Sequence, residues 1–102
     1  MSKRLLIDVR AKQELKAAAR WYEQQLRGLG AEFIEAVDAA LLRVKEKPES
    51  GSSIPGVDTN VDARRVLLKR FPYAVVYIEL HSEIRVLAFA HTSRRPGYWQ
   101  DR

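Results

Sequence analysis

The segment Ala74-Val75-Val76-Tyr77-Ile78 is apolar at both alternating positions of an extended chain. A strand of this kind is expected between two neighbours, with both of its faces covered. Residues 63–70 and 84–91 also have strand character, and the stretches Phe71-Pro72 and His81-Ser82-Glu83 are short enough to be the turns between them. The sequence therefore predicts an antiparallel meander with residues 73–80 in the middle.

Two amphipathic helices are predicted upstream of these strands. Apolar residues recur at helical spacing over residues 11–26, and Gly28-Leu29-Gly30 interrupts the pattern. A second helix follows and ends before Pro48. Its wide apolar stripe consists of Phe33, Ile34, Val37, Ala40, Leu41 and Val44. Because the connection is short, the two helices should form an antiparallel hairpin with one apolar side.

The remaining segments complete the predicted fold. Arg4–Val9 is a short apolar run bounded by charge and predicts a first strand, whereas residues 49–61 have the composition of a loop. The element order is then β-α-α-β-β-β. This order predicts an α+β fold in which a helical hairpin packs on a mainly antiparallel sheet, and residues 1–102 form a single domain.

The overall composition excludes several classes of protein. The chain has 102 residues and no cysteine, so it has neither a disulfide framework nor thiol chemistry. No apolar run approaches the roughly 18 residues of a transmembrane helix. Charge comes too early at the N-terminus for a signal peptide. We therefore expect a soluble intracellular protein.

The positive charge is concentrated in the C-terminal part of the chain. Residues 64–102 hold eight basic and three acidic side chains, which accounts for the whole net charge of +5. The basic residues among the outer strands are Arg64, Arg65, Lys69, Arg70 and Arg85, so we expect one side of the sheet to be exposed and basic. Such a surface suits an anionic partner, either a nucleic acid or an acidic protein segment.

Few residues suggest catalysis or metal binding. His81 is predicted in a solvated turn, whereas His91 ends the last strand and is a candidate acid or base, or else simply closes the strand. Two histidines without cysteine do not make a structural zinc site, and no cofactor motif is present. The helical carboxylates are expected at solvent positions without catalytic partners; they include Glu14, Glu23, Glu32 and Glu35.

The segment Arg94-Arg95-Pro96-Gly97-Tyr98-Trp99 combines bases and aromatics without a hydrophobic period. Arginine offers a planar fork for carboxylate or phosphate, and aromatic rings offer stacking faces. Alternatively, Tyr98 and Trp99 fold back to cover an open edge of a small core. Both interpretations are compatible with each other.

Several strings in this order and spacing resemble the RelE/ParE superfamily of bacterial type II toxin-antitoxin toxins, and most closely its ParE-like branch. They are Ala18-Ala19-Arg20-Trp21-Tyr22-Glu23, Gly28-Leu29-Gly30-Ala31-Glu32-Phe33, Arg64-Arg65-Val66-Leu67-Leu68-Lys69-Arg70-Phe71-Pro72-Tyr73, Val86-Leu87-Ala88-Phe89-Ala90-His91 and Arg94-Arg95-Pro96-Gly97-Tyr98-Trp99. The resemblance implies a cytoplasmic bacterial toxin that arrests growth until a cognate antitoxin binds it in a hetero-oligomer. For the ParE-like branch, the antitoxin expected is ParD-like, of the ribbon-helix-helix type.

The resemblance also implies an antitoxin-binding surface across the helical hairpin and the sheet. An exposed apolar groove beside the helices would invite a partner helix, and basic side chains would suit an acidic antitoxin tail. The residues predicted to bind the antitoxin are Trp21, Tyr22, Phe33, Val37, Arg64 and Arg70.

Two targets are compatible with the superfamily. ParE-like members bind DNA gyrase and inhibit it without catalysis or cofactor, and the predicted contact residues are Arg94, Arg95, Tyr98, Trp99, Arg65 and Arg85. RelE-like members cleave mRNA on the ribosome, for which the metal-independent catalytic candidates are Arg64, Arg65, Arg85, His91 and Tyr98. The position of the RelE catalytic arginine falls on Thr92, which carries no charge, so we favour the gyrase inhibitor. A third alternative, a non-toxic nucleic-acid-binding module, would explain the basic C-terminal part without the family resemblance.

Overall fold

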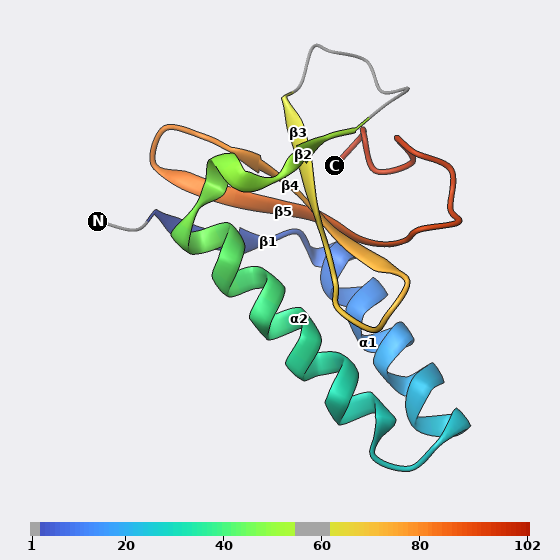
Figure 1. Cartoon of the computed structure of the whole chain (residues 1–102). Helices are drawn as coiled ribbons and strands as arrows, with labels where there is room; N and C mark the ends of the chain where they lie inside the picture. The colour runs from blue at the N-terminus through green and yellow to red at the C-terminus, as the bar shows by residue number, and fades with distance from the viewer. Residues whose placement is uncertain (1–2, 55–61) are drawn as a thin grey trace.

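The computed structural model describes residues 3–54 and 62–102 (Figure 1). Residues 1–2 and part of the predicted loop 49–61, namely 55–61, lie outside the described residues. The elements in chain order are β1 (Arg4–Ile7), α1 (Val9–Gln25), α2 (Leu29–Glu46), the 3-10 helix η1 (Pro48–Ser50), β2 (Ser52–Ser53), β3 (Ala63–Leu67), β4 (Tyr73–Glu79) and β5 (Glu83–His91).

The five strands form one sheet in the order β1-β5-β4-β3-β2. The predicted meander is confirmed, since β4 pairs antiparallel with β3 on one side and with β5 on the other. β1 pairs parallel to β5, which makes the sheet mixed. A parallel neighbour requires a crossover connection, and the rest of the chain from β1 to β5, including both helices, supplies it. The predicted α+β class is thereby confirmed.

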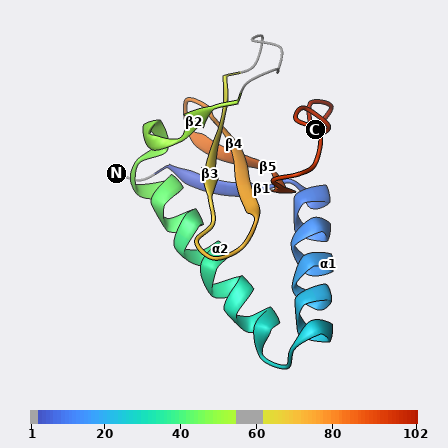
Figure 2. The same cartoon turned by 45° about the vertical axis from the view of Figure 1, so that its right-hand side comes forward.

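The helical hairpin is confirmed, with boundaries set by its caps. Asp8, predicted as part of the first strand, instead caps α1 by accepting a hydrogen bond from the Arg10 amide at 2.8 Å. The turn between the helices needs Gly28, whose φ is +89°. The Glu23 carboxylate accepts hydrogen bonds from the amides of Gly28 and Gly30 at the start of α2. Figure 2 shows the helices meeting at this turn and spreading apart toward the sheet.

The main core lies between the helices and one face of the sheet. Phe33 and Val37 of α2 are fully or almost fully buried there, together with Tyr77 of β4. Phe33 packs against Phe71 and Tyr73 with ring centroids 5.3 and 5.2 Å apart, in edge-to-face geometry. This cluster fixes the hairpin against the meander, and we call the surface it covers the helix face.

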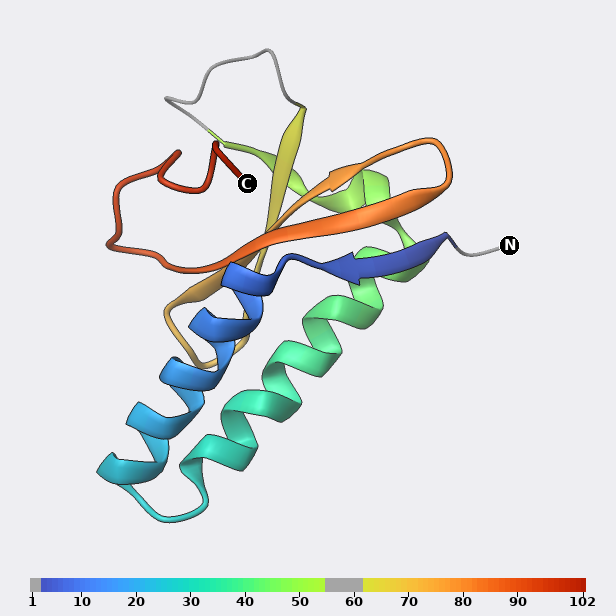
Figure 3. The ribbon, with the colours of Figure 1, turned by 180° about the vertical axis from the view of Figure 1, so that it is seen from behind.

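A second, smaller core covers the opposite surface of the sheet, which we call the far face. Trp99 packs there against Val76, Leu87 and Ala88, and only 2% of its surface is exposed. Figure 3 shows the residues after β5 leaving the end of the strand and turning back beside the sheet. The interpretation that Tyr98 and Trp99 fold back over a small core is therefore confirmed, Tyr98 packing on this cluster at its border.

The predicted loop after α2 contains two short elements that its composition did not indicate. The Tyr77 hydroxyl donates a hydrogen bond to the carbonyl of Pro48 at 2.6 Å and accepts one from the amide of Gly51 at 3.0 Å. Ser52 and Ser53 then pair with β3. A buried tyrosine thus holds this segment on the sheet. None of the helices in the described ranges is both long enough and apolar enough to cross a membrane.

Candidate functional site

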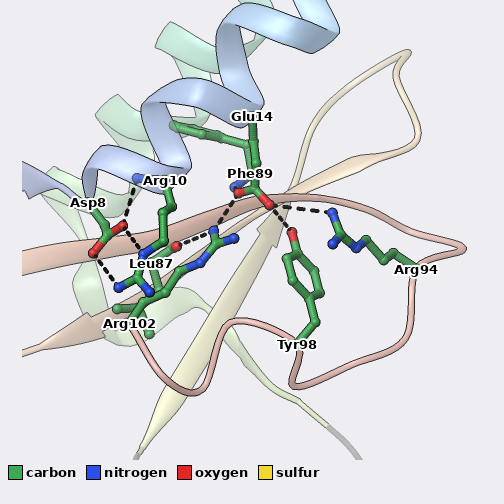
Figure 4. Close-up of polar contacts among 8 residues, drawn as sticks. All are labelled: Asp8, Arg10, Glu14, Leu87, Phe89, Arg94, Tyr98 and Arg102. Atoms are coloured by element: carbon green, nitrogen blue, oxygen red, sulfur yellow. Dashed lines mark hydrogen bonds and ion pairs between the residues drawn. The ribbon is translucent and has the colours of Figure 1, made fainter.

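Glu14 of α1 connects the helical hairpin to the C-terminal segment, which we define as residues 92–102 (Figure 4). One oxygen, Oε1, accepts hydrogen bonds from the Phe89 amide at 3.2 Å and from Arg102 Nη1 at 2.8 Å. The other, Oε2, accepts the Tyr98 hydroxyl proton at 2.6 Å and lies 3.6 Å from Arg94 Nη1. The side chain is only 15% exposed. We call these contacts the Glu14 network.

The network replaces a missing strand at the edge of β5. β1 leaves the sheet after Ile7, and the last backbone bond on that edge joins the Asp8 amide to the Val86 carbonyl at 2.9 Å. Beyond it, the Leu87 carbonyl accepts from Arg102 at 3.1 Å and the Phe89 amide donates to Glu14. Charged side chains therefore satisfy an edge that would otherwise be open to pairing.

The expectation that Glu14 lies at a solvent position is wrong. α1 presents Glu14 on the side that meets the sheet edge, because Glu14 stands three residues after Ala11 and four before Ala18, both of which are buried. That spacing was the available signal, since a carboxylate on an apolar helical stripe needs a partner. The partners come from residues 89–102, and their arrival at α1 depends on the tertiary fold.

Tyr98 lies between two guanidinium groups in the network. The Arg94 Cζ atom is 3.7 Å from the ring centroid and that of Arg102 is 5.2 Å from it. Burial raises the pKa of the Tyr98 phenol far above its ordinary value, and the hydrogen bond to Glu14 raises it further. At neutral pH the phenol is therefore protonated, and it donates a hydrogen bond to the Glu14 carboxylate.

Arg102 is the most enclosed cation of the network, with 12% of its side chain exposed. Burial alone would lower the pKa of this guanidinium, but the hydrogen bond to Glu14 and the negative charge of Glu14 raise it. The guanidinium of Arg102 is therefore charged at neutral pH.

Two concave surfaces adjoin the network. The α1 groove has a volume of about 300 Å³ and is lined by Glu14, Ala17, Ala18, Trp21, Tyr73, Phe89, His91 and Arg94. The far-face pocket has a volume of about 210 Å³; its lining includes Ala74, Val76, Ala90 and Trp99, with Arg65, Arg94 and Arg95 as its basic members. Arg94 and His91 line both and form the wall between them.

A longer depression runs beside α2. Its two parts, of about 650 and 440 Å³, share Arg43. The larger is lined by residues of α2, η1, β2 and β3, and the smaller by residues of α2 and the turn after β3. Arg43 Nη2 donates to the Leu67 carbonyl at 2.8 Å, on the edge of β3 beyond the two residues that β2 covers. Among the described residues, no three His, Asp or Glu side chains are grouped as metal ligands would be.

Residues 5–96 match the ParE toxin of the type II toxin-antitoxin system parDE, which is most of the chain. The chain belongs to this family. Among solved structures, the fold is similar to a chain of a chromosomal ParDE toxin-antitoxin system from P. aeruginosa, with a TM-score of 0.75 and 15% identity. The similarity covers 89% of this chain and 97% of the other. No curated protein matches the sequence. The predicted superfamily and its ParE-like branch are confirmed.

In this ParE-family chain, the arginines do not form the single basic face that the sequence suggested. Arg64 and Arg65 are adjacent in β3, so their side chains point to opposite faces. Arg64 is opposite Tyr77 on the helix face and donates to the Glu49 carbonyl, whereas Arg65 is opposite Val76 on the far face. Side-chain alternation along a strand separates what the sequence places together.

Two further arginines are paired with nearby acids. Arg70 lies 2.9 Å from Glu32 of α2, and Arg85 lies 2.9 Å from Glu83. Both pairs are at the surface, where such contacts contribute little to stability. Arg70 occupies the turn after β3, with a φ of +72°, and so lies outside the strand in which the sequence placed it.

The residues predicted to bind the antitoxin divide into exposed and buried ones. Trp21 is 55% exposed and lines the α1 groove, and Tyr22 is partly buried against Phe33 and Phe71. Phe33 and Val37 are 0% and 1% exposed, so these two side chains are core residues that a partner does not reach in this conformation. The apolar periodicity that singled them out belongs to the packing of α2 on the sheet.

The residues predicted to contact the target also divide. Arg94 and Arg95 are exposed at the far-face pocket, where Arg65 joins them. Tyr98 lines the same pocket but is partly buried, and Trp99 is buried in the second core, which removes it from direct contact in this conformation. Arg85 is not among the residues that line the pocket.

The candidate nuclease residues do not share one site. Arg65, His91 and Tyr98 line the far-face pocket, whereas Arg64 faces the helices and Arg85 is paired with Glu83. His91 Nδ1 lies 3.1 Å from the Ser93 amide, which donates to it, and its ring stacks edge-on with Tyr73 at 5.1 Å. His91 thus closes the end of β5 as well as lining the pocket. His81 is exposed in the turn between β4 and β5, as predicted.

Proposed function

We propose that this chain is a growth-arresting toxin that binds and inhibits DNA gyrase through the C-terminal segment, without catalysing a reaction, and that a ParD-like antitoxin neutralises it. The observation that carries this proposal is the pair Arg94 and Arg95, both exposed at the far-face pocket on a segment held at Trp99 and Glu14. An anchored segment presents its arginines at a reduced entropic cost of binding.

The chemistry of the segment supports an inhibitor over a nuclease. Cleavage of RNA requires a base for the 2′-hydroxyl and cations on the phosphorane. The raised pKa of Tyr98 and its hydrogen bond to Glu14 make the phenol unsuited to the role of base. Thr92, at the position of the RelE catalytic arginine, contributes no charge, and Arg64 points to the other face of the sheet.

A supercoiling assay tests the proposed target. Purified toxin, free of antitoxin, is added to gyrase and relaxed plasmid, and we expect loss of supercoiling activity with rising toxin concentration. Unimpaired supercoiling at a large molar excess contradicts the proposal. In the same expression strain, mapping of mRNA ends separates the alternative, because only a RelE-like nuclease creates new cuts within translated codons.

The proposed antitoxin contact centres on the α1 groove. Its lining includes two small residues, Ala17 and Ala18, and two aromatic ones, Trp21 and Tyr73. An exposed tryptophan beside small residues accepts the apolar face of a partner helix, and tryptophan is common among the residues that dominate binding energy.

Substitution of Trp21 tests this contact. We expect Trp21→Ala to weaken binding of the cognate antitoxin by at least about tenfold, because the largest exposed apolar side chain of the groove is lost. Val9→Ala is the matched control, since Val9 is also exposed on α1 but does not line the groove. Equal antitoxin affinities for the Trp21→Ala variant, the Val9→Ala variant and the parent would place the antitoxin elsewhere.

A further inference from the structure

We infer that Glu14 is a positioning residue for the toxin's target-binding surface. Glu14 orients the C-terminal segment so that Arg94 and Arg95 stand at the far-face pocket. The inference rests on the proposed function, in which this segment binds the target. Glu14 does not itself contact the target in this account, because its carboxylate is occupied by the segment.

The first support is the distribution of hydrogen bonds. Within the described chain, the side-chain hydrogen bonds that join residues 95–102 to other elements end at two places, the Glu14 carboxylate and the Leu87 carbonyl. The backbone bonds of the same stretch are local turns, from Gln100 to Gly97 and from Arg102 to Trp99. One carboxylate of α1 and one carbonyl of β5 therefore set the orientation of residues 95–102, which have no strand or helix of their own.

The second support is the division of labour between Trp99 and Glu14. Burial of Trp99 is a non-directional apolar contribution that draws the segment toward the sheet without fixing how the segment is turned on it. Hydrogen bonds to a carboxylate are directional and, being charge-assisted, stronger than neutral ones. Glu14 thus determines which way Tyr98 faces, and the Arg94 guanidinium, stacked 3.7 Å above that ring, follows it.

The third support is the cost of losing the carboxylate. Without Glu14 the guanidinium of Arg102, which is 12% exposed, loses the carboxylate with which it forms its ion pair. An unpaired, nearly buried charge is unfavourable, and the simplest relief is for the C-terminus to move into water. That movement carries Tyr98 away and removes the surface on which Arg94 is stacked.

Glu14→Gln is the principal test variant, and Glu23→Gln is the matched control. Both carboxylates are on α1 and both accept backbone amide hydrogen bonds. Glu23 caps α2 at the far end of the hairpin and has no contact with the segment, so its loss affects stability alone. Tyr98→Phe is a milder second variant. It retains the ring beneath Arg94 and removes only the hydroxyl that donates a hydrogen bond to Glu14.

Two measurements are made on each variant at a temperature where all of them are folded. The first is acrylamide quenching of Trp99, in a Trp21→Phe background that leaves Trp99 as the single tryptophan. The second is the concentration for half-inhibition of gyrase, in the chain that retains Trp21. We expect Glu14→Gln to expose Trp99 to quencher and to weaken inhibition by at least about tenfold. Tyr98→Phe should weaken it by about threefold, and Glu23→Gln should change neither measurement.

The outcomes distinguish failure of this inference from failure of the proposed target. If Glu14→Gln inhibits within about twofold of the parent, or leaves Trp99 shielded, the inference is wrong. Loss of inhibition by Glu23→Gln to the same extent would also overturn it, because stability alone would then explain both variants. If the parent arrests growth without inhibiting gyrase, only the proposed target falls, and growth arrest replaces inhibition as the second measurement. A parent that arrests no growth contradicts both proposals.

Discussion

The two faces of the sheet are covered by different means. On the helix face, two helices of 17 and 18 residues bury an aromatic cluster drawn from α1, α2 and the meander. On the far face, the cover is a segment without regular structure, held by Trp99 and by the Glu14 network. Dispersion and burial dominate the first surface, whereas directional polar contacts determine the second.

This difference assigns separate roles to the two surfaces. Segments with few buried apolar contacts open locally at a lower free energy than the core does, and binding segments are drawn from such regions. The helix face therefore accounts for most of the stability of the fold. The far face carries the proposed target contact, and its geometry depends on a few residues. Variants on the helix face should therefore change mainly the free energy of unfolding, whereas variants on the far face should change mainly the binding of the proposed target.

The largest expected effect is on the helix face. Phe33→Ala removes a fully buried ring that contacts Tyr22, Phe71 and Tyr73. The free energy of unfolding should fall by about 3–5 kcal/mol, from the lost burial and the cavity that remains. Urea unfolding followed by circular dichroism measures this. A loss below about 1 kcal/mol would show that the helix face is not the main source of stability.

Trp99→Ala should cost less than Phe33→Ala although tryptophan is the larger side chain. We expect the free energy of unfolding to fall by about 3 kcal/mol, the lower end of the range for a buried aromatic residue. The reason is that the C-terminal segment can move to fill the cavity. Amide hydrogen exchange should show faster exchange in residues 94–102 and unchanged protection in α2. Faster exchange spread evenly over both faces would remove the distinction between them.

Gly30→Ala probes the contact between the two helices. An added Cβ would lie 2.7 Å from the Ala19 carbonyl oxygen, which belongs to the backbone of α1 and has little room to move. The expected loss is about 1–3 kcal/mol, which outweighs the roughly 1 kcal/mol that alanine gains over glycine as a helix former. Thermal unfolding checks the sign. A stabilised variant would show that the helices are packed less closely at this point.

Asp8→Ala should have the smallest effect of the four, and one that depends on pH. Loss of the cap should cost about 1 kcal/mol at neutral pH. The hydrogen bond from Arg10 lowers the pKa of the Asp8 carboxyl below its ordinary value. Its ionised form therefore stabilises the fold above pH about 4, and this contribution disappears as the pH falls through the lowered pKa. The difference between variant and parent in urea unfolding should narrow in acid; a constant difference would contradict the account.

The helix face could be predicted from the sequence because its signals are local. Helical spacing in residues 11–26 and the continuous apolar run in residues 74–78 locate the elements, and the buried stripe of α2 follows from the helical periodicity. The errors there were small. β1 ends at Ile7 because Asp8 caps α1, and β3 ends at Leu67 because the turn begins early.

The far face could be predicted only in part. The sequence is compatible with burial of Trp99, but it carries no signal for the partner of Tyr98, since Glu14 is 84 residues away in the chain. The expected basic face failed because adjacent residues of a strand, such as Arg64 and Arg65, point to opposite sides. Contacts between distant segments depend on the topology of the sheet, which composition and spacing do not encode directly.

The most direct test of the separation between the two surfaces uses the double variant Arg94→Ala with Arg95→Ala. Its antitoxin affinity, measured by calorimetry, is compared with its inhibition of gyrase. We expect inhibition to fall by at least about tenfold while antitoxin affinity stays within about threefold of the parent, because Trp21 and the hairpin are untouched. If antitoxin binding and inhibition are lost together, the C-terminal arginines support the fold as a whole and the separation of roles is wrong.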